Sequence, residues 1–213
     1  MRNEFYADSR DVSKWSVIAG LVKEFGFSTV VQATMLRQDR KEGHGGTRHR
    51  PSICDPAIER YFEEERRIIE ANPRERRIGR VVDLPKAAGL ACTIVVDERP
   101  FEGQNLDYRR PYFEEVVRTT GAAIQPVLAF LDPDNGLSFL GDPQPTQVAP
   151  SEVAMVFESV RGSGGLLIYQ HAVRKTAWAE EARDLARLAL PKEVEAMVFK
   201  DRDVAFLFFR GSR

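Results

Sequence analysis

The chain has 213 residues, of which 43% are hydrophobic and 30% charged, and its formal net charge is −1. No stretch approaches the roughly 20 apolar residues of a membrane helix, and residues 1–4 lack the apolar core of a secretory signal. We therefore expect a cytoplasmic protein without a membrane partner. Its two cysteines, Cys54 and Cys92, have no paired spacing, which argues against a disulfide framework or a cysteine-based zinc site. The length suits a single domain over residues 1–213.

Helix and strand patterns alternate through the first half of the chain. A buried helical face containing Trp15 and Val22 can follow a cap at Asp8 or Ser9, and a segment rich in β-branched residues comes next. The expected elements, in chain order, are a helix at 9–24, a strand at 27–36, a helix at 56–71, a strand at 92–96 and a helix that begins after Pro111.

The second half has clearer boundaries, because proline and glycine separate its apolar runs. We expect a buried strand at 127–131, a helix from Pro150 that ends at 162–165, a strand at 166–170, a helix at 178–189, and a hairpin of strands at 194–199 and 204–210. This order predicts a three-layer α/β domain with a mostly parallel sheet and a C-terminal antiparallel hairpin, which is a Rossmann-like arrangement.

Polar residues follow two of the predicted buried strands. Asp132, Asp134 and Asn135 come directly after the run Val127–Leu131, while Tyr169, Gln170 and His171 end the next strand. If the two strands are parallel neighbours, these side chains share the edge where ligands collect in open α/β sheets. Asp132, Asp134, Asn135 and His171 are therefore the candidate catalytic residues. In an alternative interpretation, Asp132, Asp134 and His171 hold Mg²⁺ or Mn²⁺, and Asp134-Asn135-Gly136 is also a good turn sequence.

Basic residues are concentrated in two short segments. The first lies in a glycine-containing loop at about 37–55, which we expect to be mobile, and the second lies at 74–80. Such segments can neutralise nucleic-acid phosphates, although short charge runs are more often solvated surface. The candidate phosphate contacts are Arg40, Arg48, Arg50, Arg76 and Arg77.

The predicted first helix begins with Asp8, Asp11, Lys14 and Trp15. An exposed helix N-terminus can hold an anion, with Lys14 one turn inside it. The alternative is an N-cap, a local Asp/Lys pair and a tryptophan in the core. Both interpretations are open at this point.

The closing order of strands and helices, over roughly residues 110–210, resembles the C-terminal half of class I S-adenosylmethionine-dependent methyltransferases. Within that resemblance, Asp132-Pro133-Asp134-Asn135 falls where nucleic-acid amino-methyltransferases carry an Asp/Asn-Pro-Pro-aromatic motif. Asp134 and Asn135 occupy the third and fourth positions, and Gly43, Gly45 and Gly46 do not have the spacing of the family's cofactor loop. Asp-Pro-Asp ending one strand and Tyr-Gln-His ending the next also resemble an uncharacterised prokaryotic group, which implies no activity.

Three functions are compatible with these patterns. The first is a methyltransferase-like enzyme that acts on nucleic acid with S-adenosylmethionine at an acidic strand-end site. The second is a Mg²⁺- or Mn²⁺-dependent phosphodiesterase or nuclease. The third is a non-catalytic binding or assembly module on the same scaffold, which predicts an open surface rather than a pocket beside Asp132.

Overall fold

A six-stranded mixed sheet forms the centre of the protein. The computed structural model describes residues 2–38, 51–101, 103, 105–138, 143–172 and 177–211. The strand order is β2-β1-β3-β6-β8-β7. The parallel strands are β2 (Thr93–Asp97), β1 (Thr29–Ala33), β3 (Val127–Leu131) and β6 (Gly165–His171). β8 (Val204–Gly211) runs antiparallel to β6 and to β7 (Val194–Asp201), which confirms the predicted C-terminal hairpin.

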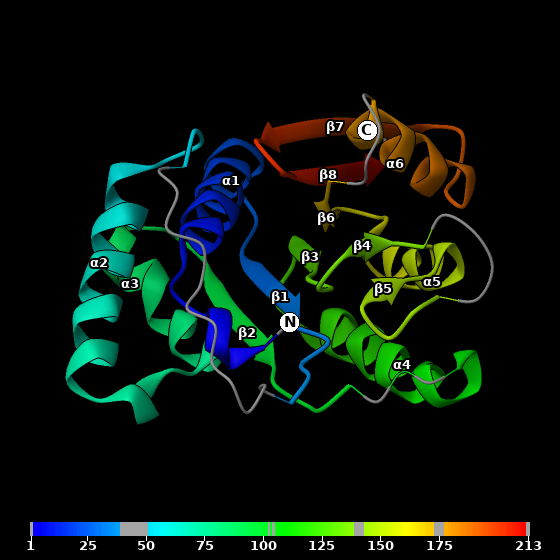
Figure 1. Ribbon diagram of the computed structural model, residues 1–213. Coiled ribbons are helices and arrows are strands. Elements are labelled where there is room, and N and C mark those ends of the chain that lie inside the picture. The colour runs from blue at the N-terminus through cyan, green and yellow to red at the C-terminus, as the bar shows by residue number, and fades with distance from the viewer. Residues whose placement is uncertain are drawn as a thin grey trace.

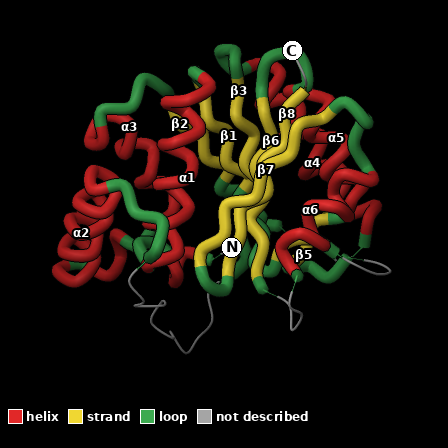
Figure 2. Tube along the Cα trace, turned by 90° about the horizontal axis from the view of Figure 1, so that it is seen from above, coloured by secondary structure: helices red, strands yellow, loops and turns green. Residues whose placement is uncertain are grey.

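Helices cover both faces of this sheet, so the predicted three-layer α/β fold is confirmed (Figure 1, Figure 2). One face carries α1 (Ser9–Phe25), α2 (Pro56–Ala71) and α3 (Leu84–Ala88). The other face carries α4 (Leu106–Ala122), α5 (Pro150–Val160) and α6 (Trp178–Leu188). Among the described residues, no helix combines the length and the apolar composition that crossing a membrane requires.

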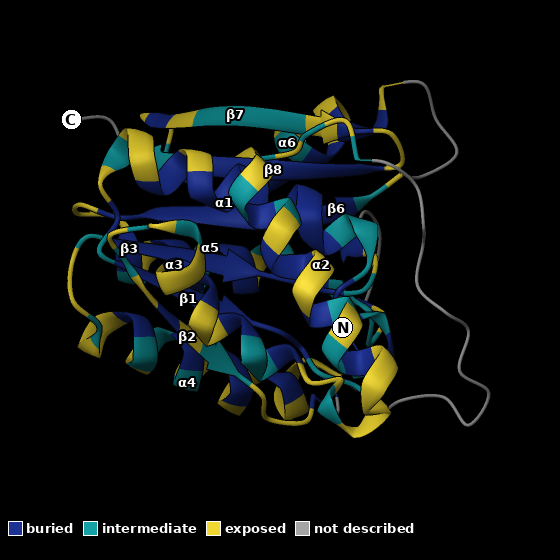
Figure 3. Ribbon diagram, turned by 90° about the vertical axis from the view of Figure 1, so that its left-hand side faces the viewer, coloured by how far each residue is buried: buried dark blue, intermediate teal, exposed yellow. Residues whose placement is uncertain are grey.

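α1 lies between the sheet and α2, and its residues 11–19 are all buried. Its start is fixed by Asp8, whose side chain accepts hydrogen bonds from the backbone N–H groups of Arg10 and Asp11. Its end is fixed by Gly26, which has a φ of +70°. The strands β3, β6 and β8 are likewise buried, whereas α2 exposes part of its surface (Figure 3). The first helix is thus an internal element, and its polar residues must find partners inside the protein.

The start of α4 was predicted wrongly. The helix begins at Leu106, before Pro111 rather than after it, because the side chain of Asn105 caps the first turn at the N–H of Tyr108. Arg109 is therefore a helical residue. Its guanidinium is fully buried and makes a two-pronged ion pair with Glu152, with both N–O distances 2.7 Å.

Several short elements had no counterpart in the predicted pattern. They are the 3-10 helices η1 (Asn3–Phe5), η2 (Pro73–Glu75) and η3 (Ile78–Asp83), α3, and the two-residue strands β4 (Gly136–Leu137) and β5 (Gln147–Val148). Elements of two to six residues are too short to show a periodic pattern. Contacts distant in the sequence hold them, such as the bond from the N–H of Ile78 to Asn3 Oδ1.

Candidate functional site

The two strand ends that carry the candidate catalytic residues are neighbours. β3 and β6 pair in parallel, with Leu131 opposite Ile168. Asp132 therefore follows β3 beside Tyr169 on β6, and the predicted adjacency is confirmed. Side chains alternate along a strand, so Tyr169 and His171 project from the same face while Gln170 projects from the other.

This sheet edge includes the point where the chain connections change direction. β1 leads through α2 to β2 on one side, whereas β3 leads through α5 to β6 on the other side. The two connections also use opposite faces, since α2 packs in one hydrophobic core and α5 in the other. In open α/β sheets, the crevice beyond the strand carboxyl ends at such a point is the usual ligand site.

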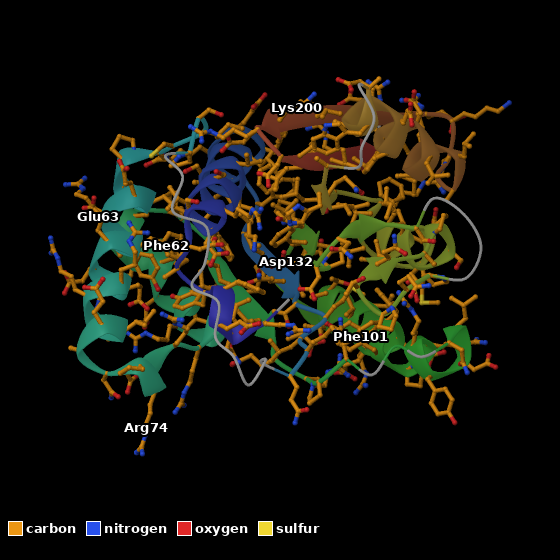
Figure 4. All side chains as sticks on the ribbon, viewed as in Figure 1. Phe62, Glu63, Arg74, Phe101, Asp132 and Lys200 are labelled. Carbon is orange, nitrogen blue, oxygen red and sulfur yellow. The ribbon has the colours of Figure 1, made fainter. Side chains whose placement is uncertain are left out.

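A pocket of about 260 Å³ lies at this place, and Asp132 occupies a central position in Figure 4. Its lining combines four basic groups, four acidic groups and several neutral polar or aromatic side chains. The lining residues are Arg2, Phe5, Asp8, Arg10, Asp11, Lys14, Arg37, Asp132, Pro133, Asp134, Asn135, Thr146, Tyr169 and His171. All four candidate catalytic residues thus line one pocket, and their catalytic role stays a prediction.

The carboxylate of Asp132 accepts hydrogen bonds from two buried side chains. Its Oδ2 accepts hydrogen bonds from Lys14 Nζ at 2.9 Å and from Gln32 Nε2 at 2.8 Å. Lys14 Nζ also contacts Asp11 Oδ1 at 2.9 Å, and all four side chains are buried. Burial alone would lower the pKa of Lys14. The carboxylates of Asp11 and Asp132 together outweigh this effect and hold the pKa well above its ordinary value. Lys14 is therefore a charged group that links α1 to the end of β3.

The carboxyl groups at the start of α1 have raised pKa values. Burial and the negative charge of Asp11 raise the pKa of Asp8 to about 7. Burial also raises the pKa of Asp11, although Lys14 opposes this effect. Trp15 is buried against Phe130. The N-cap, the Asp/Lys pair and the core tryptophan of the second interpretation are all present.

Tyr169 and His171 form a hydrogen-bonded pair in the pocket. The distance between the phenol oxygen and His171 Nε2 is 2.9 Å. Burial and the nearby Arg10 lower the pKa of His171 to about 4, and burial holds the pKa of Tyr169 well above its usual range. At neutral pH the pocket therefore contains an uncharged imidazole next to an uncharged phenol.

The Asp-Asn-Gly turn is held by Gln170 from the opposite side of the sheet. Gln170 Oε1 accepts from the N–H of Leu137 at 2.8 Å, and Nε2 donates to the carbonyl of Asn135 at 3.2 Å. The chain bends at residues 134–135, and Gly136 has a φ of +99°, a value that glycine permits. Asp134 lies 3.9 Å from Arg37. Gln170, expected beside Asp132 and Asp134, instead supports the turn because it projects away from the pocket.

Of the candidate phosphate contacts, the structure describes Arg76 and Arg77, and neither lines the pocket. Arg40, Arg48 and Arg50, with most of the loop at 37–55, lie outside the described residues. Arg76 and Arg77 are exposed, and Arg76 donates to the carbonyl of Glu4. In Figure 4 their neighbour Arg74 points away from Asp132. Their contact with phosphate stays a prediction.

Among the described residues, no group of three or more His, Cys, Asp or Glu side chains is arranged to hold a metal ion. The carboxylate of Asp132 already has Lys14 and Gln32 as partners. The Mg²⁺ or Mn²⁺ interpretation of Asp132, Asp134 and His171 therefore stays a prediction.

The fold and this site define a Rossmann-like α/β protein with a polar pocket at the carboxyl edge of its sheet. A search of protein-family models, of the curated proteins and of the solved structures finds no match for this chain. The site must therefore be interpreted from its own chemistry.

Proposed function

We propose that the protein is a methyltransferase-like enzyme that acts on nucleic acid, and that its reaction takes place in the pocket beside Asp132. The observation that carries this proposal is the position of the pocket. It lies at the carboxyl ends of β1 and β3, where the chain connections diverge, and its lining includes Asp132, Asp134, Asn135 and His171. The antiparallel hairpin after the parallel strands also agrees with the resemblance to class I methyltransferases.

The charged side chains in the pocket match the charged groups of S-adenosylmethionine. This cofactor has a flat adenine ring, two positive groups and a carboxylate, and when bound it supplies an electrophilic methyl group. Asp134 would hold a positive group and Arg37 would hold the carboxylate. The pocket volume of about 260 Å³ lies just below the range of typical ligand sites, roughly 300–1,000 Å³.

Phe5 adds an aromatic group to the pocket at a place that the motif did not indicate. Asn135 stands where an aromatic residue would stack on a nucleic-acid base in the related motif. In the described part of the chain, Phe5 is half-buried, lines the pocket and belongs to neither hydrophobic core. A side chain with these features is available to stack on a planar ring, and such stacking is worth about 1–3 kcal/mol per base.

Asp132 and His171 have distinct expected roles. The carboxylate of Asp132 accepts a hydrogen bond from the group that receives the methyl, and so orients it. The imidazole of His171 is uncharged at neutral pH because its pKa is about 4. It is therefore a weak base, suited only to the proton of a strongly acidic group such as a newly methylated, positively charged amino group. Tyr169 holds the imidazole through the 2.9 Å contact with Nε2.

The non-catalytic module predicted an open surface beside Asp132, so the pocket favours the enzyme hypothesis. Metal-dependent phosphodiester cleavage is the chemical alternative for the same residues. The two enzyme hypotheses differ in the ligand that stabilises the fold, since a ligand that binds only the folded state raises the melting temperature.

The test is methyl transfer from radiolabelled S-adenosylmethionine to DNA and RNA of mixed sequence. The wild type should label nucleic acid, and Asp132→Asn should lower the rate at least about 100-fold, within the usual effect of a general acid–base or orienting group. Asp184→Asn is the matched control, because Asp184 is exposed on α6 and pairs with Arg183. Absence of labelling by the wild type, with no melting shift from S-adenosylmethionine, would contradict the proposal. A shift with Mg²⁺ or Mn²⁺ alone would favour the phosphodiesterase alternative.

A further inference from the structure

Asp132 uses only one of its carboxylate oxygens for contacts within the protein. Both Lys14 Nζ and Gln32 Nε2 donate to Oδ2. In the described part of the chain, no donor contacts Oδ1, although Asp132 is only 2% exposed and lines the pocket. The second oxygen is therefore the one left for a bound molecule.

Lys14 is the cation that holds Asp132 in this arrangement. Its side chain is 3% exposed and lies beside the rings of Phe130 and Tyr169, with Nζ 5.9 and 5.4 Å from their centroids. It approaches one oxygen of Asp11 and one of Asp132 at the same distance, 2.9 Å. The two carboxylate oxygens cannot be farther apart than twice that distance. A buried cation between two carboxylates balances charges that would otherwise repel each other without solvent to screen them.

We propose that Lys14 is the positioning residue of this site: it balances Asp11 and Asp132 together, and it fixes Asp132 so that Oδ1 receives an N–H or O–H donor of the bound molecule. The favoured ligand group is a neutral or positively charged hydrogen-bond donor. An anionic group is disfavoured next to Oδ1. The assignment of a ligand to Oδ1 rests on the proposed function, whereas the coupling of Lys14, Asp11 and Asp132 does not.

Other charged or titratable groups also line the pocket with Asp132. The start of α1 supplies Asp8 and Arg10, and Arg2 lies near η1. Arg37, Asp134, Tyr169 and His171 come from the strand ends. These groups are unchanged in the variants below, so differences between the variants report on the pair Lys14 and Asp11.

Removal of Lys14 has a distinctive consequence. In Lys14→Met the apolar stem is retained, but Asp11 and Asp132 face each other without a cation. Two carboxylates that share a site cannot both remain ionised easily, and one of them takes up a proton at a higher pH than before. In Lys14→Met/Asp11→Asn the second negative charge is also gone, which removes the repulsion.

The experiment is an NMR titration of the side-chain carboxyl carbon of Asp132 in aspartate-labelled protein. Relative to the wild type, Lys14→Met should raise the titration midpoint of Asp132 or of Asp11 by about 1–3 pH units. The double variant Lys14→Met/Asp11→Asn should remove at least half of a rise at Asp132, and Lys14→Met/Asp132→Asn should do the same for a rise at Asp11. Lys14→Arg should stay close to the wild type. Circular dichroism shows whether each variant folds. If Lys14→Met does not fold, the double variant Lys14→Met/Asp11→Asn, which has the same net charge at this site as the wild type, can still be titrated.

Unchanged midpoints in folded Lys14→Met would overturn the proposal. So would a rise that persists in full in the corresponding double variant, because repulsion between the two carboxylates would then not be its cause. The titration needs no substrate, so its outcome is separate from that of the methyl-transfer assay. If transfer is observed, Lys14→Met should lower kcat more than it raises KM for nucleic acid, and it should move the pH profile of kcat.

Discussion

Gly136→Ala tests how the protein holds the turn that carries Asp134 and Asn135. Gly136 has a φ of +99°, and a Cβ added there would lie 2.3 Å from Gln170 Oε1. Gln170 is fully buried, and its side chain makes hydrogen bonds to both sides of the turn. Neither the backbone nor this side chain can accommodate the methyl group without a change.

The expected cost follows from two contributions. A non-glycine residue in a sparsely populated φ region costs about 1–3 kcal/mol. If Gln170 moves away, the buried N–H of Leu137 loses its acceptor, which costs about 1–3 kcal/mol. Together these predict a loss of about 2–6 kcal/mol in the free energy of unfolding, or roughly 4–24 °C in melting temperature for a domain of this size.

Urea unfolding followed by circular dichroism measures this loss, and Gly20→Ala is the matched control. Gly20 is exposed inside α1 with nothing within 4 Å of an added Cβ. The same substitution there should stabilise the protein by about 1 kcal/mol, because alanine is the better helix former. The two variants should therefore change stability in opposite directions. A Gly136→Ala protein within about 0.5 kcal/mol of the wild type, the usual range of neutral surface changes, would refute the reasoning.

Two further predictions concern buried charged groups and pH. Arg109→Met should destabilise the protein by about 3–5 kcal/mol in urea unfolding, because it leaves the buried carboxylate of Glu152 without its cation. Arg109→Met/Glu152→Gln should recover part of that loss, and equal stability of the single variant and the wild type would contradict the prediction. His171 takes up a proton near pH 6.5 in the unfolded chain but only near pH 4 in the folded protein. The unfolded state therefore holds more protons within that window, and stability should fall as the pH decreases through it. Asp8, with a pKa of about 7, changes stability in the opposite sense, so the measured quantity is the difference between the wild type and His171→Asn; a difference independent of pH from 7 to 4 would contradict the prediction.

Much of the fold was predictable because local signals agreed with the tertiary structure. The run Val127–Leu131 is a fully buried strand, Asp55-Pro56 starts a helix with a side-chain cap, and the hairpin turns at Arg202 and Asp203. The start of α4 was not predicted, because proline is a strong break signal in a sequence, whereas the cap at Asn105 is a single polar residue. Pro111 lies inside the helix, and the buried guanidinium of Arg109, one turn from its start, pairs with Glu152.

The candidate site was predictable in its location but not in its contacts. Parallel strands bring their carboxyl ends together, so the adjacency of Asp132 and Tyr169 followed from the order of elements. The contact between Lys14 and Asp132 spans 118 residues, and no local pattern indicates it. The direction of the Gln170 side chain could be predicted, since side chains alternate along β6 and Gln170 therefore lies on the face opposite to Tyr169 and His171.

The most direct test of the central claim is calorimetric binding of S-adenosylmethionine to the wild type, to Asp134→Ala and to the exposed control Asp184→Asn. If the pocket beside Asp132 is the functional site, the wild type and the control bind one molecule per chain with equal affinity. Asp134→Ala should bind at least about tenfold more weakly, equivalent to about 1.4 kcal/mol. Absence of binding to the wild type, or equal affinity of all three proteins, would contradict the account.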